Sequence, residues 1–208
     1  MYVIKSHLPV NNVPWDLIHK DCDSATDVPP LIYGEFMDDS IATIQLHQRR
    51  DLEDWTLSFR DEVSKLIKPL LWADANYNDV ADGCWFARYK QGGYVDWHKH
   101  EPYVDLVAVW YLQGTGTLAV QHQGKIYNIE TAPGDLLVFP GTLLHSTLAN
   151  QSDVDRIIMS VDLCLTRQTM KKLVQLKSYN QDQVDKIYKE RQEQLFIKIK
   201  EHNEINPA

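Results

Sequence analysis

The chain has 208 residues, of which 44% are hydrophobic and 24% are charged, and its formal net charge is −8. These values suit a globular protein with a sizeable core, and we expect one domain over residues 1–208. An acidic surface repels a phosphate backbone, so nucleic acid is not an expected partner. The MYVIKSHLPV start lacks the apolar core of a signal peptide, and no apolar run approaches the roughly 20 residues of a membrane span. We therefore expect a soluble cytoplasmic protein with no membrane partner.

The three cysteines, Cys22, Cys84 and Cys164, are odd in number and lack the close spacing of a metal site. This usage favours a reducing compartment. We expect each cysteine to be a small buried hydrophobic residue.

The first half of the chain predicts two strands and a helix. Met1–Val10 and Thr43–Gln48 favour short strands, and the isolated His7, His19 and His47 are interpreted as surface or core residues rather than ligands. From Asp51 the apolar residues recur at helical spacing, and Pro69 ends or kinks this helix. We expect the apolar stripe to pack on a sheet; it consists of Leu52, Trp55, Phe59, Val63, Leu66, Ile67 and Leu70.

Between Cys84 and Leu163 the chain alternates between turns and short segments rich in β-branched and aromatic residues. About eight strands separated by turns every 8–12 residues are typical of a β-sandwich or barrel rather than a parallel α/β sheet. The predicted strands are Cys84–Lys90, Tyr94–His98, Asp105–Leu112, Thr117–Gln121, Lys125–Ile129, Leu136–Phe139, Leu143–Leu148 and Arg156–Leu163.

The last part of the chain, about residues 166–204, is predicted to be helical. Asn180 and Gln183 have the spacing of a capping box, and an amphipathic stripe follows within KIYKERQEQLFIKIK. The stripe either covers the outside of the sheet or forms a dimer contact, so a monomer and a homodimer both remain open.

Three histidines have the arrangement of a facial metal site. Side chains at i and i+2 of a strand share one face, which brings His98 and His100 together. His145, 45 positions after His100 and following GDLLVFP, supplies a third imidazole. Three ligands on one face leave positions open on the metal, although imidazole alone does not distinguish Fe(II), Zn(II) and Cu(II).

Arg156 is the candidate anion-binding residue, 11 residues after His145. Arg156, Ile158 and Ser160 share one face of a strand whose other face is wholly apolar. A buried guanidinium needs a partner, and a dicarboxylate fits through a bidentate fork. The alternatives are a salt bridge to one of the 29 acidic residues or exposure at the strand end. A tyrosine hydroxyl, with Tyr89 the first choice, is placed to complete a carboxylate clamp.

These segments resemble the 2-oxoglutarate/Fe(II)-dependent oxygenases, in particular the prolyl-4-hydroxylase-like group and phage and bacterial groups. The resemblance rests on Tyr89-x-x-Gly92-Gly93-x-x-x-x-His98-x-His100, then GDLLVFPGTLLHSTLAN, then DRIIMSVDL, and covers about residues 84–163. It implies a mainly β fold: a double-stranded β-helix, or jelly-roll, core with an N-terminal-side helix and a helical C-terminus. It also implies a dioxygenase that hydroxylates an unidentified protein or small-molecule substrate. His98, His100 and His145 would hold Fe(II). Arg156, Tyr89 and Ser160 would bind 2-oxoglutarate as cosubstrate alongside O2.

One position departs from the family pattern. The family has His-x-Asp/Glu followed by a distant His, whereas His100 occupies the acidic position here. A carboxylate lowers the charge on the metal, which a neutral imidazole does not do. The third ligand is therefore either His100 or a nearby carboxylate, with Asp96, Glu101 and Asp105 as candidates.

Two other functions remain open on the sequence. The first is a cupin-type metalloenzyme that does not use 2-oxoglutarate, which gives Arg156 no special role. The second is a non-catalytic jelly-roll binding module in which the histidines are incidental. Metal analysis separates the second from the enzymes, and 2-oxoglutarate binding separates the two enzymes from each other.

Overall fold

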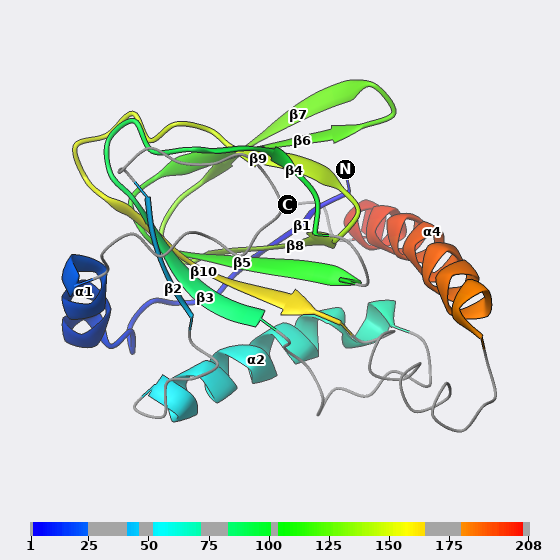
Figure 1. Ribbon diagram of the computed structural model, residues 1–208, viewed down its shortest axis with the longest axis horizontal. Helices are drawn as coiled ribbons and strands as arrows, with labels where there is room; N and C mark the ends of the chain where they lie inside the picture. The colour runs from blue at the N-terminus through cyan, green and yellow to red at the C-terminus, as the bar shows by residue number, and fades with distance from the viewer. Residues whose placement is uncertain are drawn as a thin grey trace.

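The computed structural model describes residues 2–24, 41–45, 52–71, 83–100, 104–164 and 180–205 (Figure 1). His47, Glu101 and the side chain of Cys22 lie outside the described part of the chain. The described elements, in chain order, are β1 (Ile4–His7), α1 (Trp15–Ser24), β2 (Ile41–Gln45), α2 (Glu53–Ile67) with a 3-10 turn at Lys68–Leu70, β3 (Gly83–Tyr89), β4 (Val95–His98), β5 (Leu106–Gln113), β6 (Gly116–His122), β7 (Lys125–Thr131), β8 (Asp135–Pro140), β9 (Leu144–Thr147), β10 (Arg156–Leu163) and α4 (Gln181–Ile205).

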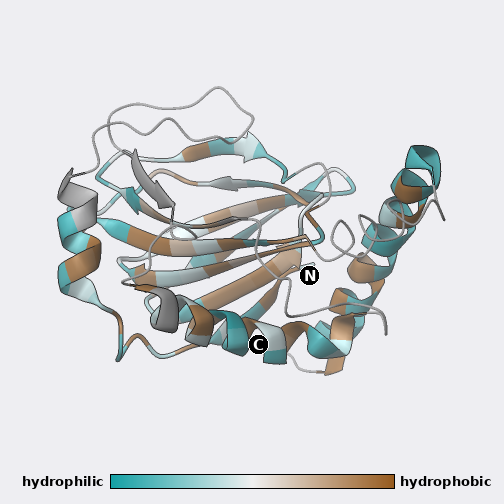
Figure 2. Ribbon diagram, turned by 60° about the horizontal axis from the view of Figure 1, so that its bottom comes forward, coloured by the Kyte–Doolittle hydropathy of each residue, from teal (hydrophilic) through white to brown (hydrophobic). Residues whose placement is uncertain are grey.

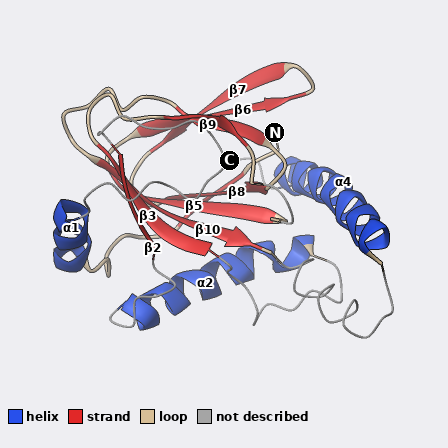
Figure 3. Cartoon of the chain, in the orientation of Figure 1, coloured by secondary structure: helices blue, strands red, loops and turns tan. Residues whose placement is uncertain are grey.

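Two antiparallel sheets face each other. The larger sheet has the order β1-β8-β5-β10-β3-β2 and the smaller has the order β4-β9-β6-β7. The strands from β3 to β10 supply four to each sheet, which is the arrangement of a jelly roll, while β1 and β2 lengthen the larger sheet at its two edges. The predicted mainly β jelly roll with flanking helices is therefore confirmed (Figure 3).

The central strands of the larger sheet, β8, β5 and β10, are buried on both faces because they carry apolar residues in both alternating positions. Ile157, Met159 and Val161 of β10 face a core shared with the helices, whereas Ile158 faces the space between the sheets. Hydrophobic positions accordingly run along most of the strands (Figure 2).

Helix α2 covers the outer face of the larger sheet, as its apolar stripe predicts. Trp55 and Phe59 pack their rings on Trp110 of β5, with centroid separations of 5.7 and 5.4 Å. The helix ends before the 3-10 turn that contains Pro69, which confirms the predicted stop. Helix α1 was not predicted, because its ten residues contain few apolar positions; Pro14 precedes it and Ile18 is its fully buried side chain.

Helix α4 begins at the predicted capping box. The Gln183 amide donates to Asn180 Oδ1 at 3.0 Å, and the Asn180 amide donates to Gln183 Oε1 at 2.9 Å. Its buried residues pack against this same chain, beside β1 and β8, so the stripe covers the sheet. Whether the protein forms a homodimer stays a prediction, as does the assignment of the whole chain to one domain.

Two further expectations concern the cysteines and membrane-spanning helices. Cys84 and Cys164 are buried, as predicted. None of the described helices combines the length and the apolar character that crossing a membrane requires.

Candidate metal centre

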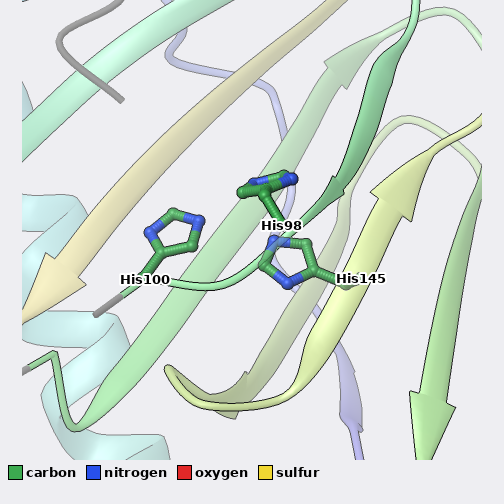
Figure 4. A group of neighbouring side chains, drawn as sticks. All are labelled: His98, His100 and His145. Carbon is green, nitrogen blue, oxygen red and sulfur yellow. The ribbon is translucent and has the colours of Figure 1, made fainter. Parts of the chain in front are cut away.

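The three predicted histidines lie together at one end of the space between the sheets. His98 is the last residue of β4 and is directly opposite His145 of β9 in the antiparallel register. His100 lies two residues beyond the strand, and its amide donates to Gly141 O at 2.9 Å. The shared face predicted for His98 and His100 is thus produced by a strand end and the loop after it. One ligand atom from each of the three side chains lies within 4.8 Å of the others (Figure 4).

Each imidazole is held through its Nδ1 atom. His98 Nδ1 lies 2.7 Å from Asp96 O, and His145 Nδ1 lies 2.8 Å from Leu143 O. A carbonyl oxygen only accepts hydrogen bonds, so these two Nδ1 atoms carry the proton, and Nε2 is the nitrogen with the lone pair in each ring. His100 Nδ1 contacts the Asp162 carboxylate at 2.7 Å, with the same consequence. All three rings therefore have Nε2 as the available ligand atom.

Burial keeps two of the rings neutral. Desolvation, with a smaller effect of the neighbouring His100, lowers the pKa of His98 to about 4. Desolvation and the other two histidines hold the pKa of His145 well below its usual value. Neutral imidazole is the form that binds a metal, so these two side chains are ready to bind at neutral pH.

The carboxylates considered as alternatives lie elsewhere. Asp96 is exposed, and its Oδ1 accepts the Trp97 amide at 2.7 Å. Asp105 is fully buried, but it is not part of the group of potential ligands, which in the described residues consists of three histidines. The geometry favours His100 over both, and Glu101 lies outside the described residues.

Arg156 is the first residue of β10 and is completely buried. Its Nη2 donates to Leu148 O at 2.9 Å and more weakly to Gly93 O at 3.4 Å. Nε and Nη1 are buried and have no hydrogen-bond partner among the described residues, and no described acidic group pairs with this side chain. The predicted burial is confirmed, and neither salt-bridge pairing nor strand-end exposure is seen.

The guanidinium of Arg156 lies against Tyr89 and Gly116. The guanidinium carbon lies 4.6 Å from the centre of the Tyr89 ring, which is opposite Arg156 on β3. The Tyr89 hydroxyl bonds to the Thr147 side chain, so Tyr89 meets the guanidinium with its ring face rather than its hydroxyl. Ser160 is buried on the same face of β10, opposite Trp85 of β3.

Two residues of this region escaped the sequence interpretation. Gly116, at the start of β6, is close enough to Arg156 that an added Cβ would lie 2.5 Å from Nη1. Asp162 lies on the interior face of β10 and reaches His100. A glycine before a strand and an acidic residue near a strand end are too common for either to stand out in the sequence.

The fold and these side chains define a jelly-roll protein with a three-histidine metal-type site and a buried, partly unpaired arginine. A family model described as "Putative 2OG-Fe(II) oxygenase" matches residues 113–162. The matched segment contains His145, Arg156, Ser160 and Asp162, whereas His98 and His100 precede it.

Solved structures of similar fold include two prolyl hydroxylases. A Pseudomonas putida prolyl-4-hydroxylase has a TM-score of 0.59 at 19% identity, with 78% of this chain and 92% of that chain covered. A Trichoplax adhaerens prolyl hydroxylase, in complex with a peptide fragment of the hypoxia inducible factor oxygen degradation domain, has a TM-score of 0.63 at 12% identity, covering 81% and 86%. A Burkholderia pseudomallei oxidoreductase of the 2OG-Fe(II) oxygenase family has a TM-score of 0.59 at 11% identity, covering 78% and 84%. No curated protein sequence gives a significant match.

The predicted resemblance to the 2OG-Fe(II) oxygenase superfamily is confirmed by the family match, and the neighbouring structures confirm the fold. Three imidazole ligands suit Fe(II), and a buried guanidinium with unsatisfied nitrogens suits a carboxylate. The residues present thus fit Fe(II) and 2-oxoglutarate.

Proposed function

We propose that this protein is an Fe(II)- and 2-oxoglutarate-dependent oxygenase that hydroxylates a protein or small-molecule substrate. The single observation that carries the choice of cosubstrate is Arg156, a wholly buried guanidinium with two unpaired nitrogens. The family match and the three-histidine group support the choice of metal and reaction class.

His98, His100 and His145 would hold the iron. Their Nδ1 contacts fix the orientation of each ring before the metal arrives, so little rearrangement is needed for binding. When bound, Fe(II) and 2-oxoglutarate supply the oxidising chemistry that inserts one oxygen atom of O2 into a substrate C–H bond. The chain's own residues position the reactants and exclude water from them.

The Arg156 guanidinium would bind the distal carboxylate of 2-oxoglutarate. An unpaired charge in a desolvated interior is unfavourable, and burial already lowers the pKa of this guanidinium. A carboxylate that accepts a bond from one of the two unsatisfied nitrogens, Nε or Nη1, forms a charge-assisted pair with this guanidinium, and Nη2 beside it can complete the bidentate fork. Leu148 O and the Tyr89 ring hold the rest of the group in place.

Tyr89 and Ser160 complete the proposed cosubstrate pocket. Tyr89 aligns the guanidinium plane by stacking beneath it. Ser160 offers a hydroxyl donor on the same interior face as Arg156. The substrate class follows only from likeness: two neighbours act as prolyl hydroxylases, so a peptide side chain is the first class to screen.

The test is an anaerobic titration with Fe(II) and then 2-oxoglutarate, in which the weak visible charge-transfer band of the chelate is followed. Arg156→Ala should lower 2-oxoglutarate affinity by about 30-fold to several thousand-fold, since losing one partner of a buried charge pair costs about 2–5 kcal/mol. Iron binding should remain, and Arg156→Lys should restore part of the loss. Arg191→Ala, on α4, is the matched control.

Each alternative has its own outcome. Unchanged 2-oxoglutarate affinity in folded Arg156→Ala supports a cupin-type enzyme that does not use this cosubstrate. Failure of the parent protein to bind any divalent metal supports a non-catalytic binding module.

A further inference from the structure

The Asp162 carboxylate contacts the imidazole of His100, one of the three histidines of the candidate metal site. Asp162 lies near the end of β10, and its Oδ1 is 2.7 Å from His100 Nδ1. The two residues are 62 positions apart, and their side chains are largely buried, with 19% of the Asp162 side chain and 6% of the His100 side chain exposed. A contact this short between a carboxylate and an imidazole nitrogen is a charge-assisted hydrogen bond.

The Nδ1 atoms of the other two histidines contact backbone carbonyls instead, those of Asp96 and Leu143. His100 is also the ligand that lies outside regular structure, two residues after β4 ends. Its ring has therefore no strand to orient it. The Gly141 carbonyl fixes its backbone, and Trp85 lies parallel to its ring at 6.1 Å.

Asp162 also contributes negative charge to a metal site whose three histidine ligands have none. Three imidazoles contribute no negative charge to a divalent cation, and Arg156 adds a buried positive charge on the same strand as Asp162. A carboxylate bonded to the far side of a ligating imidazole raises the basicity of that ligand and lowers the effective charge at the metal. A neutral imidazole ligand does not supply this negative charge by itself.

We propose that Asp162 is a positioning residue of the metal centre, which orients His100 and passes part of its negative charge to the metal through that imidazole. The proposal rests on the metal site of the proposed function and deepens it.

The first test measures Co(II) and Fe(II) affinity under anaerobic conditions, without 2-oxoglutarate or substrate. Asp162→Asn keeps the shape and an accepting oxygen but loses the charge, and should lower metal affinity by about 10- to 100-fold. Asp155→Asn, just before the same strand and one-third exposed, should leave affinity unchanged. The visible bands of bound Co(II) should shift in Asp162→Asn and not in Asp155→Asn, and near-UV circular dichroism checks that both variants are folded.

The second test asks whether Asp162 acts through His100. In a His100→Asp background, which keeps a metal ligand at this position but has no imidazole, Asp162→Asn should cause no loss of Co(II) affinity, because the intermediary is gone. An equal loss in both backgrounds would overturn the proposal, as would parent-like affinity and an unshifted Co(II) spectrum in Asp162→Asn. Those results leave the proposed function standing. Absence of metal binding in the parent protein overturns both.

Discussion

Gly116 shows how a residue without a side chain shapes the proposed cosubstrate pocket. The space where its Cβ would stand is filled by the Arg156 side chain, with Nη1 at 2.5 Å and Cδ at 2.8 Å from that point. Any larger residue has to displace the guanidinium. The position of the Arg156 guanidinium therefore requires a residue without a side chain at position 116.

Gly116→Ala tests this dependence. We expect 2-oxoglutarate affinity to fall by at least about tenfold, because a shift of the guanidinium weakens a charge-assisted pair by more than about 1.4 kcal/mol. Fe(II) affinity should not change. Thr117→Ala, the next residue of β6, is the control, and calorimetric titration is the measurement. A Gly116→Ala protein that binds 2-oxoglutarate like the parent places the cosubstrate away from Arg156.

The histidines give a second prediction for single residues. His98→Ala and His145→Ala should each abolish stoichiometric iron binding without unfolding the protein, since each removes one of three ligands from the facial group. His19→Ala is the control, because that ring stacks on Trp15 of α1 instead. Iron content measured after desalting checks the result. Full iron content in either variant removes that residue from the ligand set.

Helix α4 forms hydrogen bonds with the chain segments, at Asp105 and Thr142, that lie next to His100. Gln192 on this helix is buried; its Nε2 donates to Asp105 O at 3.1 Å, and its Oε1 accepts from Thr142 Oγ1 at 2.9 Å. Asp105 O also accepts from the Gly141 amide, and Gly141 O accepts from the His100 amide. One polar side chain of α4 is thus connected to the metal centre through backbone hydrogen bonds.

Gln192→Ala should lower the free energy of unfolding by about 1–3 kcal/mol, because it leaves buried polar groups without partners. Gln194→Ala, two residues along α4 and exposed, should change it by no more than about 0.5 kcal/mol. Urea unfolding of the two variants and the parent measures both values. Equal stability of the two variants would show that the α4 contact carries little energy.

For the whole molecule, the buried histidines couple stability to pH in the metal-free protein. The pKa of His98 is about 4 in the folded chain against an ordinary value of 6.5, so the unfolded chain binds more protons between these limits. The free energy of unfolding therefore falls as the pH is lowered from about 6.5 towards 4, by roughly 3 kcal/mol for this residue. His145, with its pKa also lowered, adds a loss in the same direction.

Urea unfolding of the metal-free protein at pH 7, 6 and 5 measures this dependence. Carboxylates titrate in part of the same range, so the comparison is made with His98→Gln, which should lose stability less steeply. Identical pH profiles for the parent and His98→Gln would show that His98 is as easily protonated in the folded chain as in the unfolded one.

The sequence by itself determined the features that follow from local periodicity. Alternation along residues 156–163 was enough to place Arg156, Ile158 and Ser160 on one face and three apolar side chains on the other. Helical spacing and Pro69 defined α2, and Asn180 with Gln183 defined the start of α4. The order of the three histidines and Arg156 along the predicted strands was enough to propose these four residues as a candidate site.

Only the tertiary structure decided which distant groups meet. The contact of Asp162 with His100 depends on β10 and the end of β4 lying at the same end of two different sheets, and no local pattern encodes that. The contacts of Arg156 depend likewise on Leu148, Tyr89 and Gly116, which come from three other segments. Periodicity assigns a side chain to a face, because it follows from the backbone of one element. The partner on that face is set by strand order and register, which arise from packing the whole chain around its core.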